Sequence, residues 1–157
     1  MAYDHCICDT SNMLGSSNAS KLVNVKIPAD LDNGNIVALG ALAAGESEAL
    51  IGSKPAANTP RNKLALIKAP EVMADEHLRS LGDFYNKSGK IVRGYLFESG
   101  DEFRLTAEGL DGTPAVGNAV EAAASYKLKT VTPATASSTQ IGTIIAQEGD
   151  YWVVRVD

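Results

Sequence analysis

The sequence predicts a mainly β fold: a compact antiparallel β-sandwich or small barrel, or an α+β variant of it with one short helix. Short stretches of alternating apolar and polar residues recur along the chain, and this alternation has the period of a half-buried strand. Turn-forming Gly, Asn, Asp and Pro separate the stretches at intervals of about 8 to 12 residues, which is typical of sandwiches and barrels. At 157 residues the chain has the length of one domain and needs neither disulfides nor metal to fold.

The first 20 residues differ in composition from the remainder. Residues 9–20 are small, polar and rich in Ser and Asn, so they offer little apolar surface to offset the entropy lost on ordering. We therefore expect a flexible, extended N-terminal arm over residues 1–20 that is disordered alone or gains order on a partner. A frayed terminus without a role is the alternative. A single β-rich domain is expected over residues 21–157.

The domain begins with a strand in which Val23, Val25 and Ile27 alternate with polar residues. The turn signal at residues 32–35 leads into an apolar run at residues 36–39, so the two runs are expected to pair as a hairpin. Further short strands are expected from the same pattern at residues 48–51, 63–68, 116–120 and 126–131.

Two more hairpins are predicted towards the C-terminus. One joins residues 90–97 to residues 103–106 through the turn Ser99–Asp101. The other joins residues 141–146 to residues 152–156, which would hold the end of the chain in a sheet. Surface loops are expected at residues 52–62 and 132–139, and the one short helix would fall at residues 71–81.

The charge pattern argues against nucleic-acid and membrane partners. The net charge is −5 and the basic residues are scattered, whereas nucleic-acid binding needs a positive surface that displaces counterions. No apolar run approaches the roughly 18 residues of a transmembrane helix, and we expect no secretory signal, because the first residues do not form a basic stretch followed by an apolar one. Gly109–Gly112 is explained by a turn without a phosphate ligand. We expect synthesis in a cytoplasm, where Cys6 and Cys8 stay reduced.

The cluster His5, Cys6 and Cys8, beside Asp4, is the one group with the residue types of a zinc site. The Cys-x-Cys spacing is tighter than that of usual zinc motifs, and His77 is the only other histidine. A site shared between subunits remains an alternative, as does an arm whose soft Cys side chains pack against a neighbour. We expect no metal and no cofactor.

Catalytic constellations are not recognisable either. Nucleophilic catalysis needs a base held beside a nucleophile, and no residue pattern supplies such a pair. Adjacent acids occur at Asp75–Glu76 and Asp101–Glu102, but a glycosidase needs two acids at a defined separation across a cleft, and Asp101–Glu102 suits a hairpin turn better. Asp30, Asp32 and Asn33 resemble part of a calcium loop that lacks its other ligands. The sequence thus predicts a protein that is not an enzyme, with no catalytic, cofactor-binding or metal residues.

Interaction surfaces remain as candidate sites. The arm, the loop at residues 52–62 and the Ala-rich stretch Ala119–Ala124 could each contact a partner. A carbohydrate- or ligand-binding β-module is the alternative, since it needs exposed aromatic side chains. The candidates for that role are Tyr85, Tyr95, Tyr126, Tyr151 and Trp152.

Several turn and strand motifs together resemble those of a known family. These motifs are Leu31–Gly34 with the apolar run after it, Asp83–Asn86, Gly89–Thr106, Leu110–Gly117 and Ile141–Ile145. Over residues 21–157 the chain resembles the head decoration, or cement, proteins of tailed bacteriophages, chiefly those of Gram-positive hosts. The arm at residues 1–20 is not part of the resemblance.

The resemblance implies a non-enzymatic virion protein on the exterior of a phage capsid, made in the host bacterial cytoplasm. Its partner would be the major capsid protein, and it would act as a homo-oligomer, with a trimer on a local threefold axis favoured. Repeated contacts around the shell would then add through multivalency. Another head-fibre or tail component of a phage is the nearest alternative.

Overall fold

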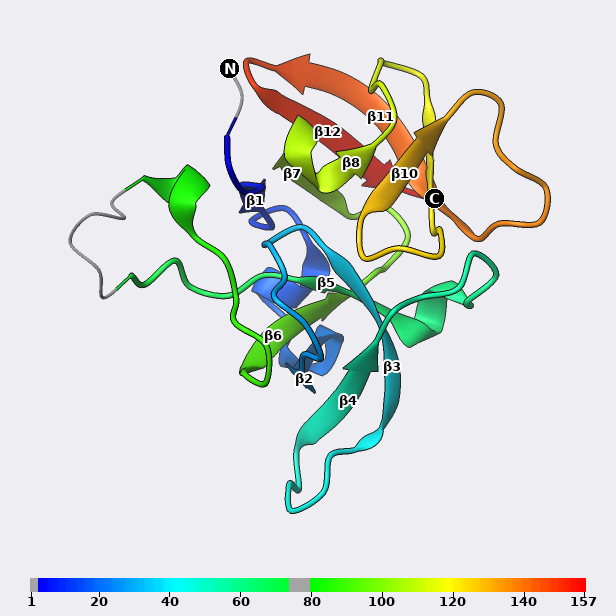
Figure 1. Cartoon of the computed structure of the whole chain (residues 1–157). Coiled ribbons are helices and arrows are strands. Elements are labelled where there is room, and N and C mark those ends of the chain that lie inside the picture. The colour runs from blue at the N-terminus through cyan, green and yellow to red at the C-terminus, as the bar shows by residue number, and fades with distance from the viewer. Residues whose placement is uncertain (1–2, 74–79) are drawn as a thin grey trace.

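A computed structural model describes residues 3–73 and 80–157, and within them the strands form a barrel and a sheet. The barrel closes in the order β2–β4–β3–β5–β6. Its strands are β2 (Leu22–Lys26), β3 (Ile36–Leu42), β4 (Ala49–Ser53), β5 (Leu64–Ile67) and β6 (Ile91–Leu96). Figure 1 shows the β3–β4 hairpin projecting from the barrel, away from the sheet.

The second group is a seven-stranded sheet in the order β1–β7–β12–β11–β9–β10–β8. Its strands are β1 (Cys8–Asp9), β7 (Glu102–Thr106), β8 (Leu110–Asp111), β9 (Ala119–Glu121), β10 (Leu128–Val131), β11 (Gln140–Glu148) and β12 (Tyr151–Val156). The mainly β prediction is confirmed, and the small barrel is one of the two predicted architectures.

The helical elements of the described residues are short 3-10 turns. They are η1 (Leu14–Ser16), η2 (Ala19–Lys21), η3 (Arg61–Lys63), η4 (Leu81–Asp83) and η5 (Ala107–Gly109). Of the helix predicted at residues 71–81, residues 74–79 lie outside the described residues.

The inside of the barrel is filled by the alternating residues that the sequence pattern identified. Val25 and Ile27 are buried there, and Val23 packs against them. Two glycines face inward on β4 and β6, the strands on either side of β2: a Cβ on Gly52 would lie 2.7 Å from Val25 Cγ1, and one on Gly94 would lie 3.0 Å from Ala65 Cβ. The narrow barrel therefore closes around glycine at positions where a larger side chain does not fit.

The barrel and the sheet share one hydrophobic core. Its barrel side includes Ile36, Leu64 and Leu66, and its sheet side includes Phe103 and Leu105. Further members come from the N-terminal segment and from the ends of the sheet: Cys6, Cys8, Met13, Tyr95, Phe97, Leu110, Val120, Ala122, Leu128, Ile141, Ile144, Val154 and Val156.

The first predicted hairpin is wrong. β2 pairs with β6 and, in parallel, with β4, whereas β3 pairs with β4 and β5. The turn residues between β2 and β3 bond to other parts of the chain instead: the Asn33 side chain accepts the Ala69 N–H at 2.9 Å, and the Gly34 N–H donates to the Ile67 carbonyl at 2.8 Å. These long-range hydrogen bonds hold the segment between β2 and β3 against the end of β5. Because β8 and β10 also pair in parallel, the β-structure is not purely antiparallel.

The second predicted hairpin is also wrong, because β6 belongs to the barrel and β7 to the sheet. The reason lies at Asp101, which is buried and accepts the N–H groups of Leu14 at 2.9 Å and Glu98 at 3.0 Å. Its own backbone carbonyl accepts the Val156 N–H. The turn that resembled a hairpin therefore redirects the chain from one group of strands to the other.

The third predicted hairpin is confirmed. β11 and β12 pair antiparallel from Gly142↔Val156 to Glu148↔Tyr151, with an irregularity near Ile144. β12 also pairs with β7, so the last strand lies inside the sheet rather than at its edge.

The prediction of an extended arm over residues 1–20 is corrected by the structure for residues 3–20. Cys6, Cys8 and Met13 are buried in the shared core, and β1 pairs with β7. The Thr106 N–H donates to the Ile7 carbonyl at 3.0 Å, and the Ile7 N–H donates to Thr106 Oγ1 at 3.1 Å. The segment is poor in apolar residues overall, but its few apolar side chains fall where the core has space for them.

The substitution Gly142→Ala should destabilise the protein by about 2 kcal/mol or more, because its Cβ would overlap the Arg155 carbonyl oxygen across the β11–β12 pair. Thermal unfolding of the variant measures this. Gly40→Ala is the control, since its Cβ would lie 3.2 Å from the Ile51 carbonyl oxygen and needs only a small adjustment. Equal melting temperatures for the two variants would contradict the prediction.

Replacing Asp101 by Asn should cost about 1 to 3 kcal/mol of stability, because an amide places a donor against one of the two N–H groups that the carboxylate accepts. Chemical denaturation of the two proteins gives the difference. Asp111→Asn is the matched control, since that half-buried carboxylate makes no hydrogen bond to a described residue. A loss no larger than that of the control would show that the Asp101 carboxylate does not hold this turn through the Leu14 and Glu98 N–H groups.

Candidate interaction surface

An exposed row of side chains on the outside of the barrel crosses the strands β4, β2 and β6, with an isoleucine at each end. Lys26 stands opposite Ile51 of β4 on one side and opposite Ile91 of β6 on the other. Residues that are paired across strands point to the same face, so all three side chains point outward together. Ile51 and Ile91 are each 46% exposed, which is high for large apolar side chains.

This outer face is open at one end of β2 and covered at the other. At the covered end Leu22 stands opposite Tyr95, which is buried. The η1 turn lies over them: a Cβ on Gly15 would be 2.7 Å from Tyr95 Cδ2 and 3.1 Å from Leu22 Cδ2. The N-terminal segment therefore covers the Leu22–Tyr95 end of this outer face and leaves the end around Ile51 and Ile91 exposed to solvent.

A groove of about 440 Å³ adjoins the open half. Ile91 forms one side of it, and Val72, which is 79% exposed, lies on the segment after β5. Phe84 and Pro70 add further apolar lining, while Arg93 brings a positive charge. The groove therefore combines apolar walls with a cationic rim.

Positive charges surround the row and the groove. Lys26, Lys90 and Arg93 are exposed, and none of them makes an ion pair with a described residue. By contrast, Lys21, Lys68 and Arg104 are neutralised by Glu98, Glu71 and Glu148. We call the set Lys26, Ile51, Val72, Lys90, Ile91 and Arg93 the barrel patch.

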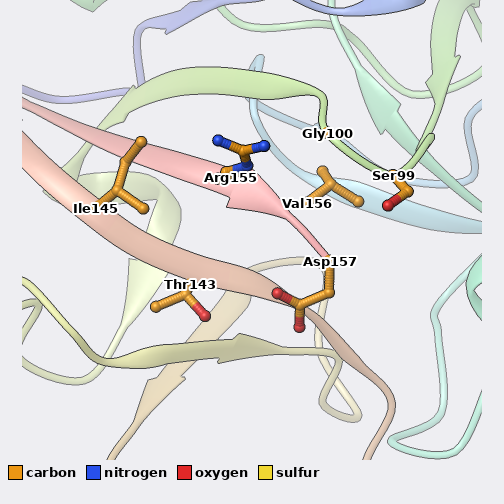
Figure 2. A pocket seen from close by; sticks show the side chains of 7 residues that line it. All are labelled: Ser99, Gly100, Thr143, Ile145, Arg155, Val156 and Asp157. Carbon is orange, nitrogen blue, oxygen red and sulfur yellow. The ribbon is translucent and has the colours of Figure 1, made fainter.

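A second depression, of about 540 Å³, lies at the ends of β11 and β12 (Figure 2). Thr143, Ile145 and Arg155 come from the two strands, and Ser99 and Gly100 come from the turn before β7. Arg61 donates a hydrogen bond to the carbonyl oxygen of Asp157 beside it. No buried polar side chain points into this depression from the described residues that line it, so it offers no specific binding site for a small molecule.

The structure places the predicted Cys/His cluster in different surroundings from those of a metal site. Burial raises the pKa of the Cys6 thiol to about 12 and raises that of Cys8 well above its usual value. His5 Nδ1 lies 2.7 Å from Asp32 Oδ1, and its ring stacks on Tyr85 with the centroids 4.9 Å apart. Within the described ranges, no three His, Cys, Asp or Glu side chains converge as metal ligands.

The acidic residues and amides considered as ligands have structural roles. Asp32 accepts the Cys6 N–H at 3.0 Å, and Asp30 accepts the Ser88 N–H at 2.8 Å. Asn33 binds Ala69, as described above, and its oxygen also accepts an N–H of the Asn86 side chain. Asp75, Glu76 and His77 lie outside the described residues.

The aromatic candidates do not form an exposed platform. Tyr95 is buried, Trp152 packs against the shared core and Tyr126 packs against the barrel core. The Tyr85 ring stacks against the His5 ring. Tyr151 lines a groove of about 550 Å³, whose charged residues include the ion pairs Lys68–Glu71 and Arg104–Glu148.

The other two predicted contact segments are partly engaged within the chain. The loop at residues 52–62 begins within β4, and its Ala57 carbonyl oxygen accepts a hydrogen bond from the Thr139 N–H. Ala119 and Val120 belong to β9, and Ala122 is buried. Sequence reasoning missed the barrel patch, although exposed isoleucines at outward strand positions were a usable signal.

Comparison of the chain with models of known protein families and with curated protein sequences finds no match. Of the helices in the described part of the chain, none is long and apolar enough to span a membrane.

Thiol reactivity offers a direct test of the buried cysteines. With pKa values raised by burial, both thiols stay protonated at pH 8, so a disulfide reagent should modify neither of them in the folded protein. Adding denaturant should release both free cysteines. Rapid modification in the folded state, followed by absorbance, would show that the segment around Cys6 and Cys8 is not packed as described.

Proposed function

We propose that the chain is a decoration protein that binds and stabilises the exterior of a tailed-phage capsid without catalysing a reaction. The observation that carries the proposal is the barrel patch: exposed apolar side chains on a closed barrel, beside cations that make no ion pair with a described residue. Contiguous exposed apolar surface is characteristic of protein–protein contact sites. The motif resemblance over residues 21–157 supplies the identity of the partner, the major capsid protein.

The architecture suits docking onto a shell that is already assembled. The closed barrel has no strand edge, and the edge strands of the sheet, β1 and β8, are only two residues long; both features limit edge-to-edge aggregation while the protein is free. Its two inward glycines and buried aliphatic residues hold the outer face in one shape, so little ordering entropy is lost on binding. Copies arranged as a trimer on a local symmetry axis would add their contacts.

Co-sedimentation with capsids tests the proposed function. Capsids assembled from the major capsid protein of the same genome, expanded and undecorated, should bind the protein saturably at a fixed ratio to the capsid subunit. Unexpanded shells are the control and should bind less. Bound protein should raise the thermal stability of the shell, since a ligand of the folded state stabilises it.

Absence of binding to both forms of the shell would rule out the decoration role. Glycan arrays and phage tail or baseplate proteins would then be the relevant partners to examine.

A further inference from the structure

We propose, on the basis of the decoration role, that the barrel patch is the docking surface and that its occupant is an acidic surface segment of the capsid subunit carrying apolar side chains. The apolar side chains would contact Ile51 and Ile91 and enter the groove beside Val72. The acids of the same segment would pair with Lys26, Lys90 and Arg93.

Apolar exposure is the first reason for choosing this surface. Among the other large exposed apolar residues, Leu14, Leu81 and Ile145 border separate depressions, and Leu42 and Val116 line none of these depressions. By contrast, Ile51 and Ile91 lie in one row across β4, β2 and β6, and Ile91 and Val72 line the same groove. The aliphatic stem of Lys26, between the two isoleucines, can extend the apolar contact while its ammonium group stays at the rim.

Charge is the second reason, and it identifies the partner chemistry. Lys87, in the turn before β6, adds another exposed cation near Lys90. These cations gather on a chain whose net charge is −5, so the patch opposes the overall sign of the molecule. A partner that buries the patch must neutralise them, because desolvated unpaired cations are costly. Carboxylates on the partner supply that neutralisation.

The same charges argue against two other occupants. If two copies met through the same face, the three cations of one copy would lie against the same positively charged patch of the other, and like charges repel. A nucleic acid would pair with the cations but would leave the central isoleucines against a polar backbone. An acidic protein segment satisfies both the apolar and the cationic parts of the patch.

The double variant Lys26→Glu, Arg93→Glu tests the inference by co-sedimentation with the expanded capsids. We expect its affinity to fall by about tenfold or more, since the substitutions replace attraction by repulsion. The matched control is Lys63→Glu, Lys129→Glu, which makes the same change in net charge on exposed residues outside the patch. The control should bind as the unmodified protein does. Thermal unfolding should show both variants folded.

A second, uncharged variant tests the apolar part. Ile91→Ser combined with Val72→Ser should also weaken capsid binding, because the groove loses two exposed apolar side chains and the barrel interior is unchanged. Its binding should keep the salt dependence of the unmodified protein, whereas the charge variant should lose it.

Carbodiimide cross-linking identifies the occupant, because this reagent joins a lysine amine directly to a carboxylate. We expect Lys26 and Lys90 to be joined to Asp or Glu of the capsid subunit. Cross-links only to Glu46 or Glu48, at the tip of the β3–β4 hairpin of another copy, would overturn the proposal in favour of self-association.

The outcomes separate this inference from the decoration role. If the unmodified protein binds capsids and the patch variants bind equally well, the docking surface is elsewhere and the role stands. Equal losses in the patch and control charge variants would also overturn the inference, since net charge alone would then govern binding. If the unmodified protein binds no capsid, the decoration role itself fails.

Discussion

The fit of Cys6 between two glycines is the constraint on which the arrangement of barrel and sheet depends. A Cβ on Gly34 would lie 2.9 Å from Cys6 Sγ, and one on Gly109 would lie 2.6 Å from it. Gly34 adjoins the barrel strand β3, and Gly109 adjoins the sheet strand β8. Any larger residue at either glycine would separate the elements that meet at this sulfur. The N-terminal segment is thus an internal part of the core.

This constraint moves the candidate binding surface away from the N-terminus. The N-terminal segment, which its composition suggested for docking, is packed into the fold from β1 through η1 and η2. The same segment covers the Leu22–Tyr95 end of the barrel face and leaves the end around Ile51 and Ile91 exposed. The position of the barrel patch is therefore a consequence of how residues 6–21 pack.

The sequence predicted local features well and long-range ones poorly, for physical reasons. Alternation at Val23, Val25 and Ile27 correctly identified a strand and its inner face, because side-chain period depends only on the local backbone. It did not identify the partners of that strand, since pairing depends on segments far along the chain. The local sequence around Asp101 predicts a hairpin turn. Only the hydrogen bonds that its carboxylate accepts from Leu14 and Glu98 show that the turn redirects the chain. The patch escaped prediction similarly, because β2 brings together isoleucines from two distant strands.

Native-state hydrogen exchange of the N-terminal segment tests this account most directly. The amides of Ile7 and Met13, which are bonded to Thr106 Oγ1 and the Thr10 carbonyl, should exchange as slowly as amides of β7 and β12, which open only with the whole core. Protection at that level would show that the segment belongs to the folded unit. Exchange of these amides within seconds, with β7 and β12 still protected, would show a detached arm. The inference that the barrel patch is the principal docking surface would then fail.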